Sequence, residues 1–513
     1  MSDIAKVIVQ AGGKGSRMKN LTNNRPKCLI SLGGRPILYS ISEAFGDDVE
    51  VIIIMDYKAE SLESYLQCFP PKFKFRTVRA DGHGTSSGLQ KAINLTQGKG
   101  FAIVWSDLYF TLRIKHEDIK RNSIGISNVI SCRWSYDNGS LVEKPNNTGN
   151  RLGIPGIFFF PDSLLLPSVP ENGEFVRFLL EKKVILEPVL MEGVKEIGTY
   201  ETYRMERDNQ INSRFFNSIE IKHGMVIKNP RERSFENLVV DEINWYRYVS
   251  GRGFNQIPQI INYKPLKMHF VKGTHPYEHI TNSSQLKTNI ISRILESLQE
   301  IHSIDHLKYN STVAREVYVG KTLERIRKVG KLIPKNKSES YIVNGKKVVN
   351  LLGVDAKAYL DTLFNTLLSR EAEFKVIHGD PTFSNILLVG KKITPIFIDP
   401  RGHFGSSKIF GDPLYDYAKL YYSAIGNYDF FNQGRFSLRL NGTQISIKID
   451  SENFEFTEAL FESELGNLMP SIKAVHALIW LSLSGYVIDD YDSVLASYFH
   501  GLRLFQEVYD EYT

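Results

Sequence analysis

Five residues near the start of the chain have the types and spacing needed to hold a triphosphate. Gly12, Gly13 and Gly15 follow a short β-branched run, and Arg17 and Lys27 come shortly afterwards. Glycines let backbone N–H groups approach phosphate oxygens closely. Arg17 suits bidentate contact with a phosphate, and Lys27 supplies a point charge. The segment therefore predicts a phosphate-binding loop at the end of a strand.

A second group of polar residues lies in the later half of the chain. His378-Gly379-Asp380 precedes Asn385, and a hydrophobic run then ends in Asp399. Phosphoryl transfer needs a carboxylate that orients the attacking hydroxyl, together with ligands for Mg²⁺. The short step from Asp380 to Asn385 lets one loop aim both side chains at one point. The pattern therefore gathers polar residues of the types that such a reaction uses.

The first group resembles the signature of the nucleotidyltransferases that make sugar nucleotides, G-G-x-G-(S/T)-R followed by P-K. Three further segments match that family in the same order: Trp105–Asp107, Val142–Pro145 and Glu196–Thr199. The resemblance covers about residues 4–205. It implies a Rossmann-like α/β domain with a mixed, mostly parallel sheet.

The resemblance also implies roles for the matched residues. Asp107 and Glu196 would bind Mg²⁺, with Glu196 standing where the family usually has Asp. Glu143 would hold a substrate hydroxyl and Lys144 the phosphate of the acceptor. In the implied reaction a phosphate monoester attacks the α-phosphorus of a nucleoside triphosphate and pyrophosphate leaves. Such a displacement depends on positioning and charge neutralisation, which Arg17 and Lys27 would provide.

Two further features of the N-terminal half do not identify the nucleotide. Gln10 replaces an aliphatic residue of the family pattern, and Gly82–Leu89 resembles the family's base and sugar contact strip. Neither identifies the base, so UTP, CTP, GTP and dTTP all stay open.

The second group resembles the choline kinase and aminoglycoside phosphotransferase family. The resemblance implies Asp380 as the catalytic base and Asn385 and Asp399 as Mg²⁺ ligands. Upstream, Lys228 resembles the lysine that binds the ATP phosphates, and Glu242 resembles the helix glutamate that pairs with it. It implies a bilobal, protein-kinase-like α+β domain.

Other residues near this motif indicate the kind of substrate and the side chains that support the lobe. Arg401 stands where choline kinases have an aromatic residue and an acid, so a cation facing the acceptor would repel choline. We therefore expect Arg401 to bind a neutral or anionic substrate. His302, Asp412 and Asp416 are expected to support the lobe. No G-x-G-x-x-G precedes Lys228, which leaves the phosphate loop of this site unassigned.

The elements that must position the first group alternate between strands and helices. Buried runs such as Val51–Met55 and Phe101–Trp105 indicate parallel strands, and three helical patterns lie among them: Ile37–Phe45, Ala59–Cys68 and Ser86–Leu95. The pattern changes near residues 204–212. We predict domains at 1–206 and 207–513.

The second domain begins with an antiparallel pattern. Ser218–Lys228 predicts a hairpin turning at His223-Gly224, and a helix follows at Phe235–Val249. Two strands are expected at Ile257–Tyr263 and Leu266–Val271. These form an N-lobe of about 213–272, and a helix-rich C-lobe of about 273–513 contains a core helix within Ala474–Val487.

Two segments of the second domain look like insertions. Residues 306–350 are rich in Lys and Arg and predict either a solvated amphipathic helix with a loop or a lid that attracts a phosphorylated ligand. Residues 435–450 alternate about Asn441-Gly442, a strong hairpin signal.

Composition limits the remaining classes of function. The 513 residues are 42% hydrophobic and 23% charged, which indicates a soluble globular protein of several domains. A net charge of +6 argues against a dedicated nucleic-acid binder. The three cysteines, the absence of a signal-peptide layout and the lack of a long apolar run predict a cytoplasmic protein without membrane insertion.

Two active sites in one chain are most simply explained by consecutive steps. A kinase would use ATP to phosphorylate a small hydroxyl substrate, with a sugar favoured, and a nucleotidyltransferase would condense the monoester with a second NTP. Both sites would use Mg²⁺, and the product would serve polysaccharide or glycan synthesis. Choline kinase with a phosphocholine cytidylyltransferase, and a pseudokinase scaffold, remain as alternatives. The oligomeric state stays open.

Overall fold

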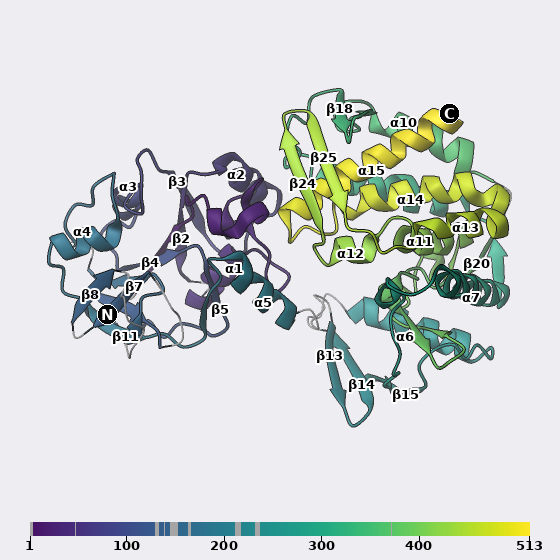
Figure 1. Cartoon of the computed structure of the whole chain (residues 1–513), viewed down its shortest axis with the longest axis horizontal. Coiled ribbons are helices and arrows are strands. Elements are labelled where there is room, and N and C mark those ends of the chain that lie inside the picture. The colour runs from purple at the N-terminus through teal and green to yellow at the C-terminus, as the bar shows by residue number, and fades with distance from the viewer. Residues whose placement is uncertain are drawn as a thin grey trace. The chain divides into compact units, whose positions relative to one another are not determined.

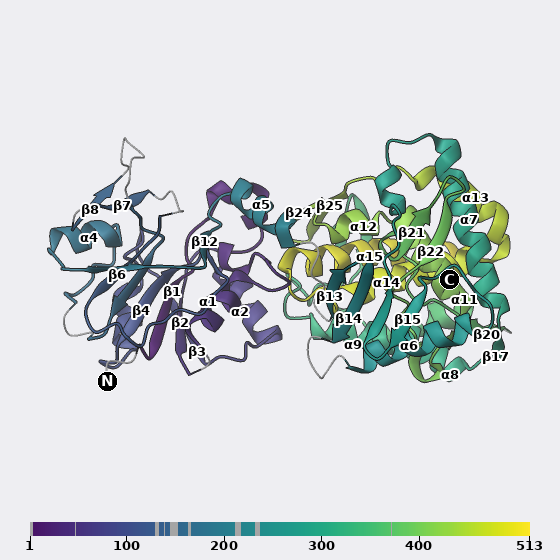
Figure 2. The same ribbon diagram turned by 90° about the horizontal axis from the view of Figure 1, so that it is seen from below.

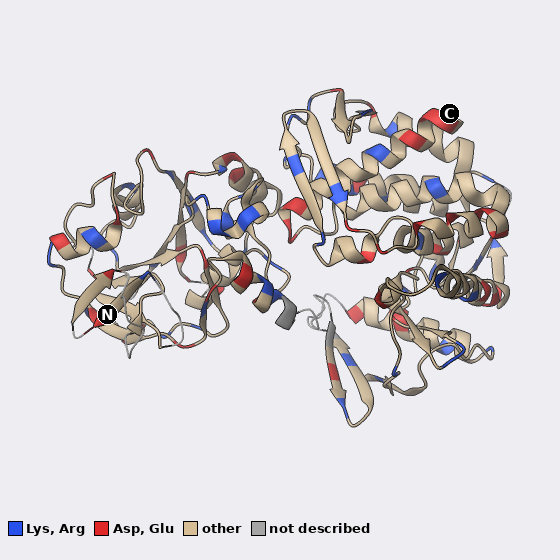
Figure 3. Cartoon of the chain, in the orientation of Figure 1, with Lys and Arg blue, Asp and Glu red and all other residues tan. Residues whose placement is uncertain are grey.

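The computed structural model describes residues 4–46, 48–128, 133–137, 139–143, 152–162, 166–210, 217–230, 236–370 and 372–513. The chain forms two compact units (Figure 1). The N-terminal unit consists of Met1–Asn212 with Asp489–Asp492, and the C-terminal unit of Ser213–Ile488 with Ser493–Thr513. Basic and acidic residues are interspersed along each unit (Figure 3), in keeping with the small net charge.

The N-terminal unit is built on a seven-stranded sheet in the order β11-β6-β10-β4-β1-β2-β3. Its neighbours are parallel except for β10, which runs antiparallel to β4 and β6. The predicted α/β fold with a mixed, mostly parallel sheet is therefore confirmed (Figure 2). The strands are β1 (Lys6–Gln10), β2 (Glu50–Met55), β3 (Phe75–Arg79), β4 (Phe101–Trp105), β6 (Ser123–Ile126), β10 (Ile157–Phe160) and β11 (Glu187–Leu190).

Smaller elements surround this sheet. A two-stranded ladder joins β5 (Leu108–Phe110) to β12 (Val194–Glu196), and a three-stranded one joins β8 (Ser140–Glu143), β7 (Trp134–Asp137) and β9 (Leu152–Gly153). The helices of the unit are α1 (Ile37–Phe45), α2 (Ala59–Cys68), α3 (Leu89–Asn94), α4 (Phe175–Glu181) and α5 (Tyr200–Gln210).

Two of the three predicted helices have the expected bounds, and one is shorter. α1 and α2 begin and end where the pattern placed them. The helix predicted at Ser86–Leu95 begins only at Leu89, because Gly88 has a left-handed φ of 73°. A β-carbon there would lie 2.7 Å from Cγ2 of Ile54, so the close approach to β2 also requires glycine.

Four residues from the far end of the chain complete the N-terminal unit. Arg25, with only 3% of its side chain exposed, places Nη1 2.5 Å from Oδ2 of Asp490. Asn24 Nδ2 donates to Oδ1 of Asp492 at 3.2 Å. This contact between residues more than 460 positions apart had no signal in the sequence.

The C-terminal unit begins with a four-stranded antiparallel sheet in the order β13-β14-β16-β15. The predicted hairpin is present and turns at His223-Gly224. Its strands are β13 (Asn217–Lys222), β14 (Met225–Pro230), β15 (Ile260–Tyr263) and β16 (Leu266–His269), and the helix α6 (Glu236–Ser250) follows the hairpin. The last two strands are shorter than the predicted runs.

The rest of this unit is mainly helical. The core helix predicted at Ala474–Val487 is present as α14 (Met469–Leu483), which begins five residues earlier and ends four residues earlier. Its residues are almost all buried. None of the helices in the described ranges has both the length and the hydropathy of a membrane-spanning segment. The helices are α7 (Ser284–Ser303), α8 (Ser311–Arg315), α9 (Lys321–Lys328), α10 (Ala356–Leu363), α11 (Pro413–Ala424), α12 (Tyr428–Asn432), α13 (Glu458–Leu465), α14 (Met469–Leu483) and α15 (Tyr491–Tyr512).

The two segments predicted as insertions meet in one sheet. Residues 306–350 include β18, which pairs in parallel with β25 of the predicted 435–450 hairpin. α9, in the same segment, buries Thr322, Leu323 and Ile326, so the helix packs against the unit. The strands of this unit beyond β16 are β17 (His306–Lys308), β18 (Ser340–Val343), β19 (Lys346–Val349), β20 (Glu373–Val376), β21 (Ile386–Val389), β22 (Thr394–Phe397), β23 (Phe410–Gly411), β24 (Phe436–Asn441) and β25 (Gln444–Ile449).

Candidate functional site

The glycine loop of the N-terminal unit leaves the carboxyl end of β1. Gln10 pairs with Trp105 of the parallel strand β4, so the loop and Asp107 emerge at the same edge of the sheet. A β-carbon on Gly12 would lie 2.9 Å from Cβ of Asp56, whereas one on Gly13 would meet no heavy atom within 4 Å. Gly15 has a left-handed φ of 61°. The loop thus needs glycine for packing at Gly12 and for its turn at Gly15, and it leaves the backbone at Gly13 accessible.

The two cations predicted to bind phosphate lie beside the two carboxylates predicted to bind metal. Nζ of Lys27 is 2.6 Å from Oδ2 of Asp107, and both side chains are about nine-tenths buried. Nη2 of Arg17 is 3.9 Å from Oε1 of Glu196, and the Arg17 side chain is 64% exposed. The structure therefore brings together four residues from three separate sequence motifs.

Pairing of β5 with β12 brings the two carboxylates together. Glu196 is opposite Leu108, and the amide of Ile197 donates to the carbonyl of Asp107 at 2.9 Å. A β-carbon on Gly198 would lie 2.9 Å from Oε1 of Glu196, 3.0 Å from Oδ2 of Asp107 and 3.2 Å from Nη2 of Arg17. The missing side chain of Gly198 keeps a small space open between these charged groups.

This space suits Mg²⁺ held jointly with phosphate. Oδ1 of Asp107 is buried, and none of the described residues hydrogen-bonds to it. Mg²⁺ in proteins is bound by one or two carboxylates together with substrate phosphate oxygens. Throughout the described ranges, no three His, Cys, Asp or Glu side chains form a metal cluster by themselves. Asp107 and Glu196 would therefore hold the ion only in company with phosphate.

The predicted substrate residue Glu143 is tightly bound by two arginines. Its Oε1 lies 2.5 Å from Nη2 of Arg133, and its Oε2 lies 2.9 Å from Nη2 of Arg177. Hydrogen bonds from Arg133 and then Arg177 lower the pKa of Glu143. No hydrogen bond or ion pair in the described part of the chain links Glu143 to Asp107. Lys144, the other predicted substrate residue, lies outside the described residues.

Glu171 organises the strip at residues 82–89 and was missed by sequence reasoning. Its Oε1 accepts hydrogen bonds from the amide of Gly88 at 3.0 Å and from Oγ of Ser87 at 2.9 Å. Gln10 also binds the strip, donating from Nε2 to the carbonyl of Thr85. The unusual Gln10 thus connects β1 to the predicted base-contact strip. Glu171 carries no local signal, because its partners are more than 80 residues away.

In the C-terminal unit, the predicted pair of Lys228 and Glu242 is formed. Nζ of Lys228, on β14, is 2.7 Å from Oε1 of Glu242, on α6, and both residues are at least 95% buried. Lys228 also forms an ion pair with Asp399. One buried ammonium therefore connects the small sheet to the end of the β21–β22 hairpin.

The three predicted polar residues of the second motif are also adjacent. Asn385 directly precedes β21 and Asp399 closely follows β22, and the amide of Ile398 donates to the carbonyl of Asn385 at 2.9 Å. Nδ2 of Asn385 donates to the carbonyl and to Oδ2 of Asp380 at 2.9 and 3.1 Å. Asp399 has a left-handed φ of 55°. Antiparallel pairing of β21 with β22 is what brings Asn385 and Asp399 to one end.

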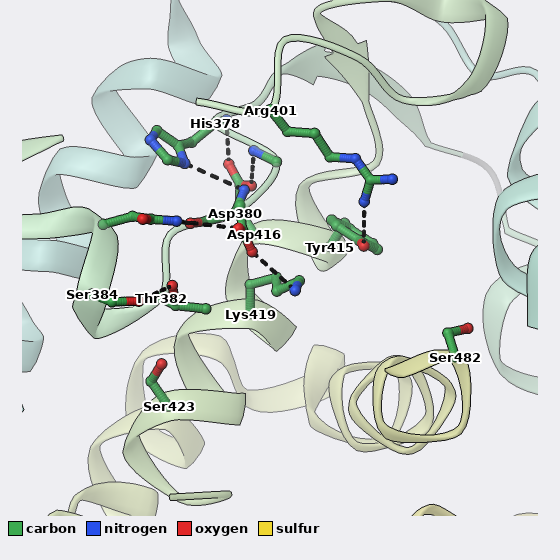
Figure 4. Close-up of polar contacts among 12 residues, drawn as sticks. His378, Asp380, Thr382, Ser384, Arg401, Tyr415, Asp416, Lys419, Ser423 and Ser482 are labelled. Atoms are coloured by element: carbon green, nitrogen blue, oxygen red, sulfur yellow. Dashed lines mark hydrogen bonds and ion pairs between the residues drawn. The ribbon is translucent and has the colours of Figure 1, made fainter. Parts of the chain in front are cut away.

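Asp416 supports the loop that carries Asp380 (Figure 4). Its two carboxylate oxygens accept the amides of His378 and Gly379 at 2.8 and 2.7 Å. Nε2 of His302 contacts the same carboxylate at 3.1 Å. Asp412 caps α11 through the amide of Leu414. These contacts are the supporting ones expected for His302, Asp412 and Asp416.

Lys419 is a site residue that sequence reasoning missed. Its Nζ lies 2.9 Å from Oδ1 of Asp380, as Figure 4 shows. Burial by itself raises the pKa of Asp380, but the charge and hydrogen bond of Lys419 lower it below its ordinary value. A weak signal existed, since Lys419 lies three residues after Asp416 on one helix face.

Arg401, the predicted acceptor residue, lies beside this loop. Its amide donates to the carbonyl of His378 at 2.9 Å, and a β-carbon on Gly379 would lie 2.9 Å from Cβ of Arg401. Its Nη1 donates to the hydroxyl of Tyr415 at 3.0 Å. Asn385 and Asp399 carry oxygen atoms of the kind that Mg²⁺ prefers as ligands.

Comparisons with known proteins find similarities for the N-terminal unit. Residues 7–119 match the family described as the MobA-like NTP transferase domain. This match covers β1, the glycine loop, Lys27 and Asp107, and it supports an NTP transferase domain in the N-terminal unit. The remaining residues, including the second site, lie outside it.

Individual proteins are similar to parts of the chain. The bifunctional protein GlmU of Methanocaldococcus jannaschii is 30% identical over 205 residues, which are 37% of this chain and 49% of that protein. A probable glucose-1-phosphate cytidylyltransferase of Bacillus subtilis is 40% identical over 63 residues, 12% of this chain and 24% of that one. The chain spans about half the length of the GlmU proteins that it matches. Among solved structures, HddC from Yersinia pseudotuberculosis is 22% identical, with a TM-score of 0.34 over 40% of this chain and 99% of that one.

Proposed function

We propose that the N-terminal unit is a Mg²⁺-dependent sugar-phosphate nucleotidyltransferase. The convergence of Arg17, Asp107 and Glu196 around Gly198 carries this proposal, together with the contact of Lys27 with Asp107. An oxygen of the sugar phosphate attacks the α-phosphorus of the NTP, a P–O bond forms, and the bond to pyrophosphate breaks. Lys27 and Arg17 stabilise the charge on the phosphates, and the backbone of the glycine loop binds them. The name of the similar probable glucose-1-phosphate cytidylyltransferase supports a sugar phosphate as the acceptor.

We further propose that the C-terminal unit is an ATP-dependent kinase of small hydroxyl compounds. The buried contact of Lys228 with Glu242 and Asp399, close to the Asp380–Asn385 pair, carries this proposal. The acceptor hydroxyl attacks the γ-phosphorus of ATP, ADP leaves, and the hydroxyl proton passes to Asp380. Lys228 would hold the ATP phosphates. The low pKa of Asp380 keeps the carboxylate ionised and ready to accept a proton.

The two activities together would convert a sugar into a nucleotide-activated sugar for glycan or polysaccharide synthesis. The kinase supplies the phosphate monoester that the nucleotidyltransferase consumes. The alternative of choline kinase with a cytidylyltransferase is disfavoured because Arg401 and Lys419 lie beside Asp380, where a quaternary ammonium would be repelled. A pseudokinase scaffold is disfavoured because Asp380, Asn385 and Asp399 are all present and in contact with site partners.

A reaction screen tests both proposals. The purified chain is incubated with Mg²⁺, ATP and each of UTP, CTP, GTP and dTTP, together with sugars, sugar 1-phosphates, polyols or choline. Mass spectrometry detects NDP-linked products, and coupled assays detect ADP and pyrophosphate. We expect an NDP-sugar from ATP, one further NTP and a free sugar. Production of CDP-choline alone would replace the sugar proposal, and lack of pyrophosphate release with every sugar 1-phosphate would refute the nucleotidyltransferase.

A further inference from the structure

Four cations gather near Asp380, although sequence reasoning singled out only one of them. Lys321 and Arg325 lie on α9, Arg401 follows β22, and Lys419 lies on α11. We call these four residues the acceptor-side cation cluster. Lys321 Nζ lies 6.0 Å from the centre of the Tyr415 ring, and Arg401 packs against the same ring at the same distance. One aromatic side chain therefore holds cations from two distant segments side by side.

Burial and mutual repulsion act strongly on this cluster. Burial, with the positive charges of Arg401, Arg325 and Lys419, lowers the pKa of Lys321 well below its usual value. Burial and the charge of Arg401 likewise lower the pKa of Arg325. Gathering like charges in a partly buried place is unfavourable unless another interaction offsets their repulsion and loss of hydration. Such an arrangement is typical of a site built for an anion.

The cluster has few carboxylate partners. Asp380 pairs with Lys419 at 2.9 Å. Within the described ranges, no carboxylate oxygen lies within 4.0 Å of the charged nitrogens of Lys321, Arg325 or Arg401. The side chains of Arg325 and Arg401 donate hydrogen bonds to neutral groups. Arg325 donates to the carbonyl of Ser482, and Arg401 donates to the ring of His403 and to the hydroxyl of Tyr415. These donors can turn to an anionic ligand without breaking an ion pair.

A cavity of about 290 Å³ opens beside the cluster. Lys321, Arg401 and Tyr415 line it, together with Glu316 and Glu324. Both glutamates are exposed, so water and salt screen their charges, whereas Lys321 and Arg401 are partly buried. The two partly buried charged residues of the lining, Lys321 and Arg401, thus form a cationic wall. Arg401 connects this wall to the loop of Asp380 by its contact with Gly379.

We propose that the kinase acceptor carries a carboxylate or phosphate in addition to its hydroxyl, and that Lys321, Arg325 and Arg401 bind this anionic group. The inference rests on the proposed kinase function and specifies its substrate class. It also assigns a role to the basic segment at residues 306–350, whose helix α9 presents Lys321 to the cavity and carries Arg325 one turn further along. The anionic group fixes the acceptor so that its hydroxyl reaches Asp380.

Binding to matched ligands tests the inference directly. The full chain is titrated calorimetrically with neutral compounds and their anionic derivatives: glucose with glucuronate and glucose 6-phosphate, mannose with mannose 6-phosphate, and glycerol with glycerate. We expect at least one anionic member to bind at least about tenfold more tightly than its neutral partner, since a hydrogen bond to a charged group corresponds to about 10- to 100-fold in affinity. Equal binding within every pair would overturn the inference.

Variants locate the anion site. Arg325→Gln and Lys321→Met should each weaken binding of the anionic ligand and raise its KM about 10-fold or more, and Arg325→Lys should restore part of the loss. Arg327→Gln, an exposed position on the same helix, is the matched control and should change neither value. The KM for ATP should stay unchanged in all four. A raised KM for ATP with an unchanged KM for the acceptor would show that the cluster serves the nucleotide and would overturn the inference.

The same experiment separates this inference from the proposed function. Anion binding that depends on Lys321 and Arg325, without ADP release for any acceptor, would refute the kinase and retain the anion site. ADP release that is equal with neutral and anionic acceptors and insensitive to both variants would retain the kinase and refute the anion site.

Discussion

Nζ of Lys27 lies 2.6 Å from Oδ2 of Asp107, joining the cation of the glycine-loop motif to the carboxylate that follows β4. The other carboxylate oxygen, Oδ1, is buried and has no hydrogen-bond partner among the described residues. Lys27 thus orients the oxygen of Asp107 that lies 3.0 Å from the position a β-carbon on Gly198 would take, at the space proposed for Mg²⁺. This arrangement explains how one side chain can bind metal and remain fixed.

Replacement of Asp107 by Asn should abolish Mg²⁺-dependent pyrophosphate release. Losing a metal ligand removes several kcal/mol of transition-state stabilisation, and we expect a fall of at least about 1,000-fold, or about 4 kcal/mol. Release of ADP by the C-terminal unit should persist and serves as the internal control. Asp118→Asn, at an exposed position of the same unit, should behave like the original chain. Near-normal pyrophosphate release in Asp107→Asn would exclude this residue from the site.

Gly198→Ala should impair the nucleotidyltransferase without unfolding it. The added methyl would lie about 3 Å from the charged atoms of Glu196, Asp107 and Arg17 and would fill the space between them. We expect kcat/KM for NTP condensation to fall at least about tenfold, because small displacements in such sites are costly. Thermal melting should change little. Full activity with Ala at this position would show that the metal and phosphates bind elsewhere.

The variants Asp380→Ala and Lys228→Ala should change the kinetic constants of the proposed kinase in different ways. Asp380→Ala should lower kcat for ADP release by about 100- to 10,000-fold, as expected for loss of a general base. Lys228→Ala should also raise the KM for ATP, because Lys228 touches ATP in the ground state. Condensation of a supplied sugar phosphate with NTP should remain normal in both. Loss of both activities in Asp380→Ala would contradict separate sites.

Lys419→Met should shift the pH dependence of the kinase. Lys419 lowers the pKa of Asp380, so its removal should raise that pKa. Asp380 must be ionised to accept the hydroxyl proton, and the acid limb of the kcat/KM profile should therefore move to higher pH. The measurement is ADP release from acid to neutral pH. A limb that stays in place would mean that another group is the base.

The stability of the C-terminal unit should depend on Glu452. Burial, with the nearby Asp429 carboxylate, raises the pKa of Glu452 to about 9. Because the folded state keeps this proton and the unfolded state releases it near pH 4, Glu452 makes stability fall as pH rises between about 4 and 9. The slope from one such group is about 1.4 kcal/mol per pH unit. This slope is measured by urea unfolding at several pH values.

Glu452→Gln should flatten this dependence and make the variant more stable than the original chain at pH 8. Glu464→Gln, at an exposed position, should leave the slope unchanged. An identical slope in Glu452→Gln would show that Glu452 is ionised in the folded state.

Local sequence patterns determined the parts of the protein whose causes are local. Helices α1 and α2 were predicted at their observed bounds because their apolar positions recur at the helical period and Pro or a turn precedes them. The hairpin at His223-Gly224 and the buried β1, β2 and β4 strands followed from turn and strand signals. The residue types at Gly12, Lys27, Asp380 and the other motif positions indicated phosphate chemistry for the same reason, since each motif is short and contiguous.

Tertiary structure decided which of these motifs meet. Lys27 contacts Asp107 because β1 and β4 are parallel neighbours, and Glu196 joins them because β12 pairs with β5. Glu171 had no detectable pattern, since its partners lie more than 80 residues away. Lys321 was indicated only as one of many cations in the basic segment at residues 306–350, because charged residues on a solvated helix look the same in sequence. Burial and the electrostatic fields of distant side chains arise only when the chain has folded. That is why the sequence indicated the two reactions, whereas the cationic wall beside Asp380 emerged only from the packing of α9 against the rest of its unit.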